Sequence, residues 1–329
     1  MSANISIFVP HNGCRNQCSF CNQFCITSQH YQPTGEDVDN AVNIALNHLG
    51  KRAQEAEIAF FGGSFTAIER EYMLSLLKSA HKYVMNGAVG GIRISTRPDA
   101  ISREILDILK SFGVTTIELG AQSMCDDVLL ENHRGHSADS VVKSSKLIKE
   151  YGFRLGLQMM TGLYCDNDEK AIKTCKKIIA LKPDCVRIYP TIVLKNTMLE
   201  KLLSEGKYHP QSLDDAVELC CTLLDMFDVA NIPVIRLGLH TIDNDAYVAG
   251  PWHSAFGELC ESLRLYRRFK AQICKQGSYE IAVSPKMVSK AIGHNRSNIK
   301  RFAETGILVK IIEDSNLNDG SFTVREVKQ

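Results

Sequence analysis

Three cysteines lie within eight residues near the N-terminus: Cys14, Cys18 and Cys21. Their spacing, Cys-x3-Cys-x2-Cys, places three thiolates on one short loop. A cubic iron–sulfur cluster has four irons and is normally held by four cysteines. Three ligands would therefore leave one iron open to bind a molecule that reacts. The pattern indicates a [4Fe-4S] cluster with an open iron.

Zinc is an alternative, because it also takes cysteine ligands and Cys25 could complete a set of four. Structural zinc sites usually use two short-spaced pairs separated by a longer run, whereas these four cysteines are crowded into twelve residues. The spacing also differs from that of two-cluster ferredoxins, whose first gaps are two residues each. Unliganded thiols remain the other alternative. The spacing favours the three-cysteine cluster over both.

Apolar runs of strand length alternate with segments of helical periodicity before residue 240. The strands are expected at Ile5–Val9, Glu57–Phe61, Gly91–Ser95, Thr115–Leu119, Arg154–Met160, Cys185–Tyr189 and Pro233–Leu237. The helices are expected at Glu36–Leu49, Arg70–Met85, Ser102–Phe112, Asp139–Tyr151, Asp168–Leu181 and Leu213–Val229. This alternation is typical of an α/β fold with a parallel sheet, either a complete or partial βα barrel or a doubly wound sheet.

Polar and glycine residues follow several of these strands. Gly62 and Gly63 end the second, Ser95 ends the third, and Glu118 and Gln122 lie at the end of the fourth. In a barrel the chemistry occurs at the C-terminal ends of the strands, and the cysteine loop leaves the first strand at the same end. Each residue alone could be a turn glycine or a satisfied core polar residue. Their recurrence beside a cluster motif favours a site.

Composition indicates a globular enzyme. The chain has 329 residues, of which 44% are apolar and 23% charged. Its length far exceeds that of a small disulfide scaffold, so the twelve cysteines are expected to be reduced, as in the cytoplasm. The first residues lack the features of a signal peptide. No apolar run approaches the roughly 18 residues needed to span a bilayer, so we expect no membrane partner.

The last 70 residues differ in character. Residues 260–329 contain thirteen Lys and Arg against seven Asp and Glu, whereas the net charge of the whole chain is +1. Strands at Glu280–Val283, Ile307–Ile312 and Phe322–Val327 flank a helix, a tight loop from Gly293 to Arg296 and a second helix. This arrangement resembles a KH module, whose Gly-x-x-Gly loop clamps a nucleic-acid backbone, although Arg296 replaces the last glycine. Arg296, Lys300 and Arg301 are therefore candidate RNA contacts. A structural cap with a solvated basic face is the alternative.

Several motifs together resemble the radical S-adenosylmethionine (radical SAM) enzymes, from about Ile5 to Phe256. Within that superfamily they look like the radical SAM part of the Elongator catalytic subunit. The motifs are Phe60-Phe61-Gly62-Gly63-Ser64-Phe65, Ile94-Ser95-Thr96-Arg97-Pro98-Asp99, Glu118-Leu119-Gly120-Ala121-Gln122-Ser123, Asn132-His133-Arg134-Gly135-His136, Arg187-Ile188-Tyr189-Pro190 and Gly250-Pro251-Trp252-His253-Ser254-Ala255-Phe256-Gly257-Glu258-Leu259. That subunit has a longer first gap between its cluster cysteines. Only about 70 residues follow Leu259, so no acetyltransferase domain is expected.

The resemblance implies a partial (β/α)6-type, TIM-like barrel over residues 1–259. The KH-like arrangement described above predicts a small α+β domain over residues 260–329. The radical SAM resemblance also implies that the open iron chelates S-adenosylmethionine, whose reductive cleavage yields a 5′-deoxyadenosyl radical. Gly62 and Gly63 would then meet the amino group of the cofactor, Gln122 its ribose, Arg134 its carboxylate and Phe20 its adenine. Ser95 and Glu118 would face the same rim.

The function that this resemblance implies is radical modification of RNA, most readily of a tRNA base, with electrons from a donor such as ferredoxin or flavodoxin. Two alternatives remain open. One is a small-molecule oxidation of the coproporphyrinogen dehydrogenase type. The other is a non-enzymatic RNA-binding protein whose metal site is structural.

Overall fold

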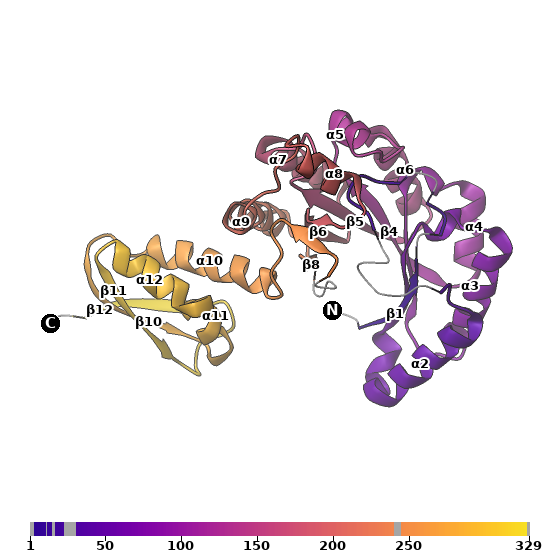
Figure 1. Ribbon diagram of the computed structural model, residues 1–329. Coiled ribbons are helices and arrows are strands. Elements are labelled where there is room, and N and C mark those ends of the chain that lie inside the picture. The colour runs from indigo at the N-terminus through magenta and orange to yellow at the C-terminus, as the bar shows by residue number, and fades with distance from the viewer. Residues whose placement is uncertain (1–2, 11, 15–16, 23–30, 240–244, 328–329) are drawn as a thin grey trace. The chain divides into compact units, whose positions relative to one another are not determined.

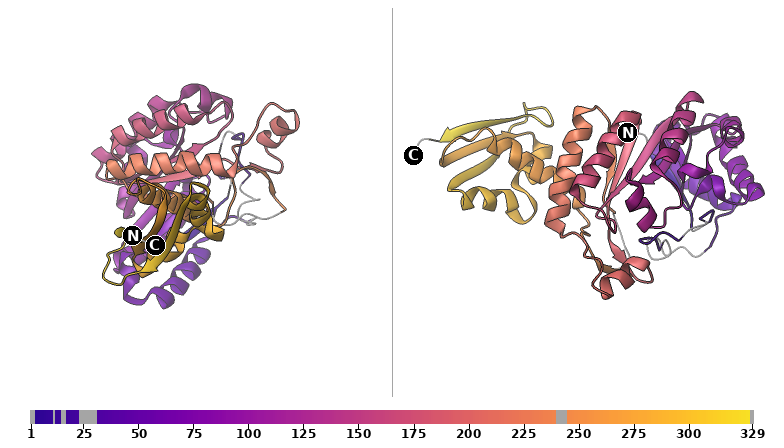
Figure 2. Two further views of the ribbon diagram at one scale, coloured as in Figure 1. Left: turned by 90° about the vertical axis from the view of Figure 1, so that its left-hand side faces the viewer. Right: turned by 90° about the horizontal axis from the view of Figure 1, so that it is seen from above.

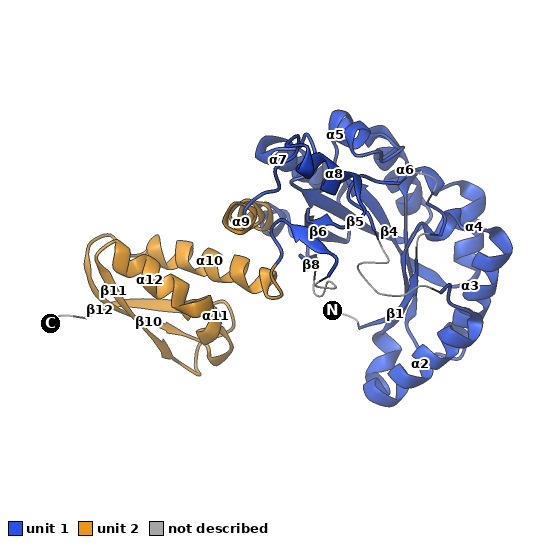
Figure 3. Cartoon of the chain, in the orientation of Figure 1, with its two compact units in different colours: residues 1–212, 226–252 blue, residues 213–225, 253–329 orange. Residues whose placement is uncertain are grey.

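The computed structural model describes residues 3–10, 12–14, 17–22, 31–239 and 245–327. Two compact units make up the chain: residues 1–212 with 226–252, and residues 213–225 with 253–329 (Figure 3). In these described ranges, no helix is both long and apolar enough to cross a membrane.

A seven-stranded parallel sheet forms the first unit and curls into a half-barrel (Figure 1). The strand order, β1-β2-β3-β4-β5-β6-β8, follows the chain without reversal. A doubly wound sheet would instead reverse its order at a switch point. The predicted partial barrel is therefore confirmed. Its strands are β1 Asn4–Val9, β2 Glu57–Gly62, β3 Gly91–Thr96, β4 Val114–Gln122, β5 Arg154–Thr161, β6 Cys185–Pro190 and β8 Val234–Leu237.

Helices follow the strands and lie outside the curl (Figures 1 and 2). Side-chain oxygens of Ser102, Ser137 and Asn167 accept backbone N–H groups at the starts of three of them, which fixes where each helix begins. Each helix buries one apolar face; in α3 the buried residues include Met73 and Leu76. The helices are α2 Gly35–Leu49, α3 Arg70–Met85, α4 Arg103–Ser111, α6 Ala138–Glu150 and α7 Asp168–Leu181.

The expected strands and helices of this unit agree with the structure to within one residue at each end, with one exception. Strand β4 continues to Gln122, three residues beyond the expected end. Short elements were not predicted, because segments of two to seven residues carry too little periodicity to be recognised. They are the helices α5 Asp126–Glu131 and α8 Met198–Ser204, and the two-stranded sheet of β7 Val193–Leu194 with β9 Tyr247–Ala249.

The second unit contains a three-stranded sheet of order β11-β10-β12, in which β10 is parallel to β11 and antiparallel to β12. Its core includes Phe269, Ile281 and Phe302, all fully buried. The helix–loop–helix between β10 and β11 occupies the predicted place. The elements of this unit are α10 Phe256–Lys270, β10 Gly277–Val283, α11 Val288–Ile292, α12 Ser297–Glu304, β11 Ile307–Glu313 and β12 Phe322–Val327, together with most of α9 Leu213–Val229.

The division between the compact units differs from the expected boundary at 259/260, which falls inside α10. Helix α10 packs against the first part of α9 within the second unit. Cys221 Sγ lies 3.3 Å from the carbonyl oxygen of Cys260, and Arg264 Nε lies 2.7 Å from Asp225 Oδ1. These contacts join residues far apart in the sequence, so composition alone does not mark them.

Candidate active site

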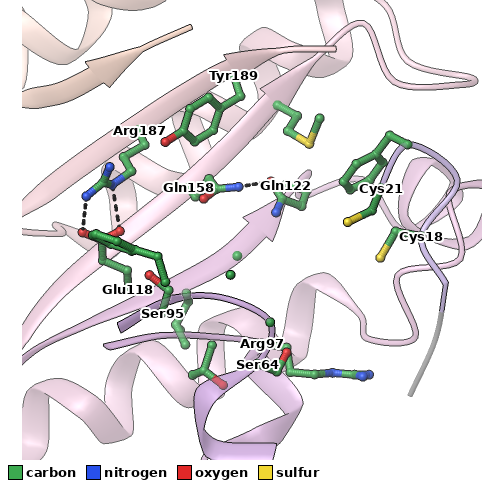
Figure 4. Close-up of a pocket in the computed structure, with 18 of the residues that line it drawn as sticks. Cys18, Cys21, Ser64, Ser95, Arg97, Glu118, Gln122, Gln158, Arg187 and Tyr189 are labelled. Carbon is green, nitrogen blue, oxygen red and sulfur yellow. Dashed lines mark hydrogen bonds and ion pairs between the residues drawn. The ribbon is translucent and has the colours of Figure 1, made fainter. Parts of the chain in front are cut away.

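A pocket of about 590 Å³ lies at the C-terminal ends of the half-barrel strands (Figure 4). This is the end at which barrel enzymes carry their chemistry, and the volume suits a small-molecule cofactor. All the candidate site residues of the first unit line this one pocket. They are Cys14, Cys18, Phe20, Cys21, Gly62, Gly63, Ser95, Glu118, Gln122 and Arg134.

The cysteine loop is held against the end of β2 by backbone contacts. The N–H of Gly63 donates to the carbonyl of Val9 at 2.8 Å, and the N–H of Ser64 donates to that of Asn12 at 2.9 Å. A Cβ on Gly63 would lie 2.0 Å from the Asn12 oxygen, and one on Gly62 would lie 2.5 Å from the Val9 oxygen. The glycine pair is therefore required for the cysteine loop to approach β2, whatever else it binds.

The middle of the loop is fixed by Asn132, which is fully buried. The Ser19 hydroxyl donates to Asn132 Oδ1 at 2.6 Å, and the Ser19 N–H donates to the Asn132 carbonyl at 3.2 Å. Ser19 lies between Cys18 and Cys21, and Asn132 lies two residues before Arg134. These bonds therefore hold the cysteines and Arg134 in one neighbourhood although 116 residues separate Cys18 from Arg134.

Arg134 directly contacts Cys18, one of the three cysteines of the loop. Its Nη1 lies 3.0 Å from Cys18 Sγ, its Nη2 donates to the Gly120 carbonyl at 2.7 Å, and its guanidinium lies over the Phe20 ring at 5.9 Å. Among the described residues its buried Nε has no hydrogen-bond partner. Burial, and then the charge of Arg134, lower the pKa of the neighbouring His136 to about 4. His136 is thus neutral near pH 7, and Arg134 is the cation at this side of the pocket.

Gln122 ends β4 with a φ of 62°. This left-handed conformation is uncommon for a residue other than glycine and often marks a functional position. Gln158 Nε2 on β5 donates to Gln122 Oε1 at 3.2 Å (Figure 4). That bond leaves the amide nitrogen of Gln122 as a donor facing the pocket. The sequence placed both glutamines at strand ends, but only Gln122 was predicted as a site residue.

Glu118 lines the pocket, but arginines occupy both of its carboxylate oxygens. Arg93 Nη1 and Arg187 Nη2 contact Oε1, the second at 3.0 Å, and Arg187 Nε lies 2.8 Å from Oε2 (Figure 4). Arg93 also pairs with buried Glu57 at 2.8 Å. Burial alone would lower the pKa of the Arg93 guanidinium, but Glu118 and Glu57 outweigh it and raise that pKa. Glu118 therefore helps to form the charged floor of the pocket.

Several pocket residues were not predicted as site residues. Tyr189, Met160 and Phe61 supply apolar surface, and the Phe61 ring lies 5.1 Å from the Arg187 guanidinium. Ser64 lies beside Cys14; partial burial raises the pKa of that thiol, and the hydrogen bond from Ser64 offsets only part of the rise. The sequence signal for most of them was their position at a strand end. That signal does not distinguish a residue facing the pocket from its neighbours.

The residues present fit an iron–sulfur cluster beside an amino-acid cofactor. Three cysteines on one loop line the pocket, and the structure shows no disulfide to any of them among the described residues. In the described part of the chain, no three His, Cys, Asp or Glu side chains converge on a single metal ion. A cubic cluster does not require this, because each thiolate would bind a different iron. Arg134, with its buried and unpartnered Nε, offers a guanidinium suited to a carboxylate. Cys25 lies outside the described residues.

The predicted RNA contacts belong to the second unit. His294, Asn295 and Arg296 are exposed between α11 and α12, and Lys300 is exposed on α12. The Arg301 guanidinium lies over the Tyr266 ring at 5.8 Å, so part of its side chain packs within the unit.

These features define the class of protein, and comparison with known families agrees. The chain belongs to the Radical SAM superfamily, whose family model matches residues 8–178, more than half of the sequence. The model of the Radical_SAM C-terminal domain matches residues 183–264. The protein is therefore a radical SAM enzyme.

Within this superfamily, the chain is similar to two kinds of curated protein. The chain is 27% identical over 231 residues to the tRNA uridine(34) acetyltransferase of Dehalococcoides mccartyi (strain CBDB1), a match covering 60% of this chain and 50% of that protein. It is 31% identical over 199 residues to human Elongator complex protein 3, covering 54% and 36%. The predicted resemblance to the radical SAM part of the Elongator subunit is thus confirmed. The chain matches half or less of the length of these curated relatives.

The fold is shared with a solved relative as well. The structure of archaeal Methanocaldococcus infernus Elp3 with an N-terminal deletion superposes with a TM-score of 0.63 at 22% identity. The match covers 83% of this chain and 64% of that one. It establishes a common architecture for the half-barrel.

Replacing Arg134 by Ala is expected to weaken binding of S-adenosylmethionine by about 1.5–3 kcal/mol, the contribution of a hydrogen bond to a charged group. This corresponds to a roughly 10- to 150-fold rise in Kd. Calorimetry on anaerobically reconstituted protein measures it, with iron content determined in parallel because Arg134 also contacts Cys18. Arg70→Ala, on the exposed face of α3, is the control. An unchanged Kd in an iron-loaded Arg134→Ala variant would remove Arg134 from the cofactor site.

Proposed function

We propose that this enzyme binds S-adenosylmethionine at a [4Fe-4S] cluster held by Cys14, Cys18 and Cys21, and uses it to modify a base in RNA, with tRNA as the leading substrate. The observation that carries the proposal is the convergence of ten candidate residues, from the cysteine loop, three strands and the segment after α5, on one pocket. When bound, the cluster and S-adenosylmethionine would supply a 5′-deoxyadenosyl radical that abstracts hydrogen from the substrate.

The side chains of the pocket have roles that follow from their positions. Arg134 would pair with the carboxylate of the cofactor, and the free amide donor of Gln122 would bind its ribose. Phe20 lies between two of the cysteines and under Arg134, where it would cover the adenine and exclude water. Glu118, Arg93 and Arg187 form a fixed charged floor beneath. Such a preorganised site holds a reactive species away from solvent.

RNA as the substrate class is supported by the names of the relatives and by the excess of basic residues in the segment 260–329. The D. mccartyi relative is named for tRNA uridine(34). The match does not extend over the whole of that protein, so our proposal adopts the RNA substrate and leaves acetyl transfer out. Electrons would come from a small donor such as ferredoxin or flavodoxin. The structure shows no disulfide among the eleven described cysteines, which suits the reducing cytoplasm.

We also propose that the helix–loop–helix of the second unit contacts the RNA backbone in a KH-like manner. Asn295 and Arg296 both have positive φ, which forms a tight exposed turn after Gly293. Buried Asn298 holds the turn in place, because its amide donates to the carbonyls of Ser262 at 2.9 Å and Ala291 at 3.1 Å. A rigid turn that presents Arg296, followed by Lys300, is the geometry that a phosphate contact requires.

The test is anaerobic incubation of the reconstituted enzyme with S-adenosylmethionine, a reductant and total tRNA, followed by nucleoside mass spectrometry. We expect a new modified nucleoside that depends on the enzyme and is absent with Cys18→Ala. Formation of 5′-deoxyadenosine without any change in the RNA would instead favour a small-molecule substrate. Absence of both would refute the radical reaction itself.

A second arm tests the contribution of the second unit. Replacing Arg296, Lys300 and Arg301 by Glu should lower the affinity for the tRNA pool by tenfold or more. It should also reduce the slope of log affinity against log salt concentration by about one for each phosphate that is no longer neutralised. Reversing the three basic residues Lys275, Lys286 and Arg325 makes the same charge change elsewhere in the unit and serves as the control. Equally weakened binding in both variants would show that the loop has no special role. Cleavage of S-adenosylmethionine without RNA should be unchanged in both.

A further inference from the structure

A second hollow of about 500 Å³ adjoins the pocket inside the half-barrel. Asn4, Arg187 and Arg236 line both hollows, so the two are adjacent. The second hollow is unusually rich in arginine, because Arg93 and Arg154 line it as well. These side chains come from β3, β5, β6 and β8, on the face of the sheet turned away from the helices.

Three of the four arginines form ion pairs with two buried glutamates, Glu57 and Glu118. Arg93 and Arg154 pair with Glu57 at 2.8 and 2.7 Å, and Arg187 pairs with Glu118 at 2.8 Å. Threonines complete the coordination of Glu57, since Thr115 and Thr116 donate to it at 2.6 and 2.7 Å. Burial alone would raise the pKa of Glu57, but these bonds outweigh it and lower the pKa, so the carboxylate is charged.

Arg236 on β8 differs from the other three. No hydrogen bond or ion pair to it is found within the described residues, and its Nε is buried. The nearby carboxylate that lines the same hollow, Asp184, instead accepts the backbone N–H of Leu155 at 2.7 Å. The side chain as a whole is partly buried, and an unpartnered Nε–H with a guanidinium that forms no ion pair among the described residues is suited to a bidentate anion. The feature therefore points to a ligand.

We propose that Arg236 binds a phosphate of the RNA substrate, adjacent to the nucleotide whose base enters the pocket. This inference rests on the proposed function and names a specificity residue for it. A nucleotide that places its base among Gln122, Gln158 and Tyr189 keeps its phosphate attached through the ribose, and Arg236 lines the boundary between the two hollows. The carboxylate of S-adenosylmethionine offers similar chemistry, so the experiment includes an arm for it.

The test compares two single-stranded uridine trinucleotides, one with natural phosphodiesters and one with neutral methylphosphonate linkages, each labelled with fluorescein. Binding to anaerobically reconstituted protein is followed by anisotropy. The wild type is expected to prefer the charged trinucleotide by about 10- to 100-fold. Arg236→Gln should lose this preference, and Arg236→Lys should recover only part of it because an ammonium has no planar fork. Arg103→Gln, an exposed arginine on α4, removes the same charge and should keep the preference.

Two further readouts separate this role from others. The Kd for S-adenosylmethionine should stay within twofold in Arg236→Gln; a larger rise would assign Arg236 to the cofactor and overturn the proposal. The melting temperature of Arg236→Gln should equal or exceed that of the wild type, because an unpartnered charge is removed, whereas a fall would indicate a structural role. The proposal is also overturned if the wild-type protein shows no preference for the charged trinucleotide. If tRNA is modified equally well by Arg236→Gln, this inference fails and the proposed function stands.

Discussion

Replacing Cys14, Cys18 or Cys21 by Ala is expected to abolish the bound cluster, so that anaerobically reconstituted protein loses its iron, its brown colour and all formation of 5′-deoxyadenosine. The three thiols lie on one loop lining one pocket, and each would supply the only protein ligand to its iron. The loss should be complete for each variant rather than partial. Iron and sulfide analysis with visible absorption spectroscopy measures it.

Two other cysteines act as controls for this experiment. Cys25→Ala removes the fourth cysteine of the N-terminal run, and Cys274→Ala removes an exposed thiol in the second unit. Both variants should retain full iron. Loss of metal in Cys25→Ala, or zinc in place of iron in the wild type, would contradict the open-iron site.

Replacing Glu118 by Gln is expected to lower the free energy of unfolding by about 3–5 kcal/mol, the usual cost of removing one partner from a buried ion pair. The Glu118 side chain is only 5% exposed, and its loss leaves both Arg93 and Arg187 short of a counter-charge. Gln keeps the shape of the side chain, so the effect comes from the charge. Urea denaturation of the apoprotein measures it, since no cofactor is then involved.

Glu104→Gln provides the matched comparison, because Glu104 pairs with Arg70 at 2.5 Å while both side chains are exposed. An exposed pair contributes about 0–1 kcal/mol. If Glu118→Gln were as mild as Glu104→Gln and weakened only cofactor binding, then Glu118 would be a cofactor ligand, as the sequence alone suggested, rather than part of the structural floor.

The contrast between Glu118 and the cysteines shows what the sequence could and could not predict. Strands and helices of the half-barrel were predicted closely, because alternating apolar runs and helical periodicity are local signals. The cysteine spacing is local as well. The partners of Glu118 lie 25 and 69 residues away, on neighbouring and next-neighbouring strands. Local sequence patterns do not reveal which strands will be neighbours in the sheet. They therefore cannot distinguish a glutamate that binds a cofactor inside the barrel from one that pairs with an arginine there.

Arg236 is a second residue whose role could not be predicted from the sequence. Its strand was predicted to within one residue, but its significance depends on the lack of an ion-pair partner among the residues that the structure describes. The sequence does not show which arginines pair with Glu57 and Glu118. The folded structure shows that these two glutamates pair with the other three arginines and not with Arg236. The left-handed Gln122 is a similar case, since it extends β4 beyond the expected end through a conformation that propensity does not favour.

The strand order of the half-barrel has a consequence for the kind of substrate that can react. Within the described sheet, β1 and β8 are the outermost strands and do not pair with each other. A closed barrel receives a substrate only through its end, so a polymer would have to present a terminus or a sharply looped segment. A half-barrel lacks that closed ring of strands, so no strand pairing would need to be broken for side-on entry of the proposed RNA substrate, with the nucleotide inserted in the middle and the chain continuing in both directions outside.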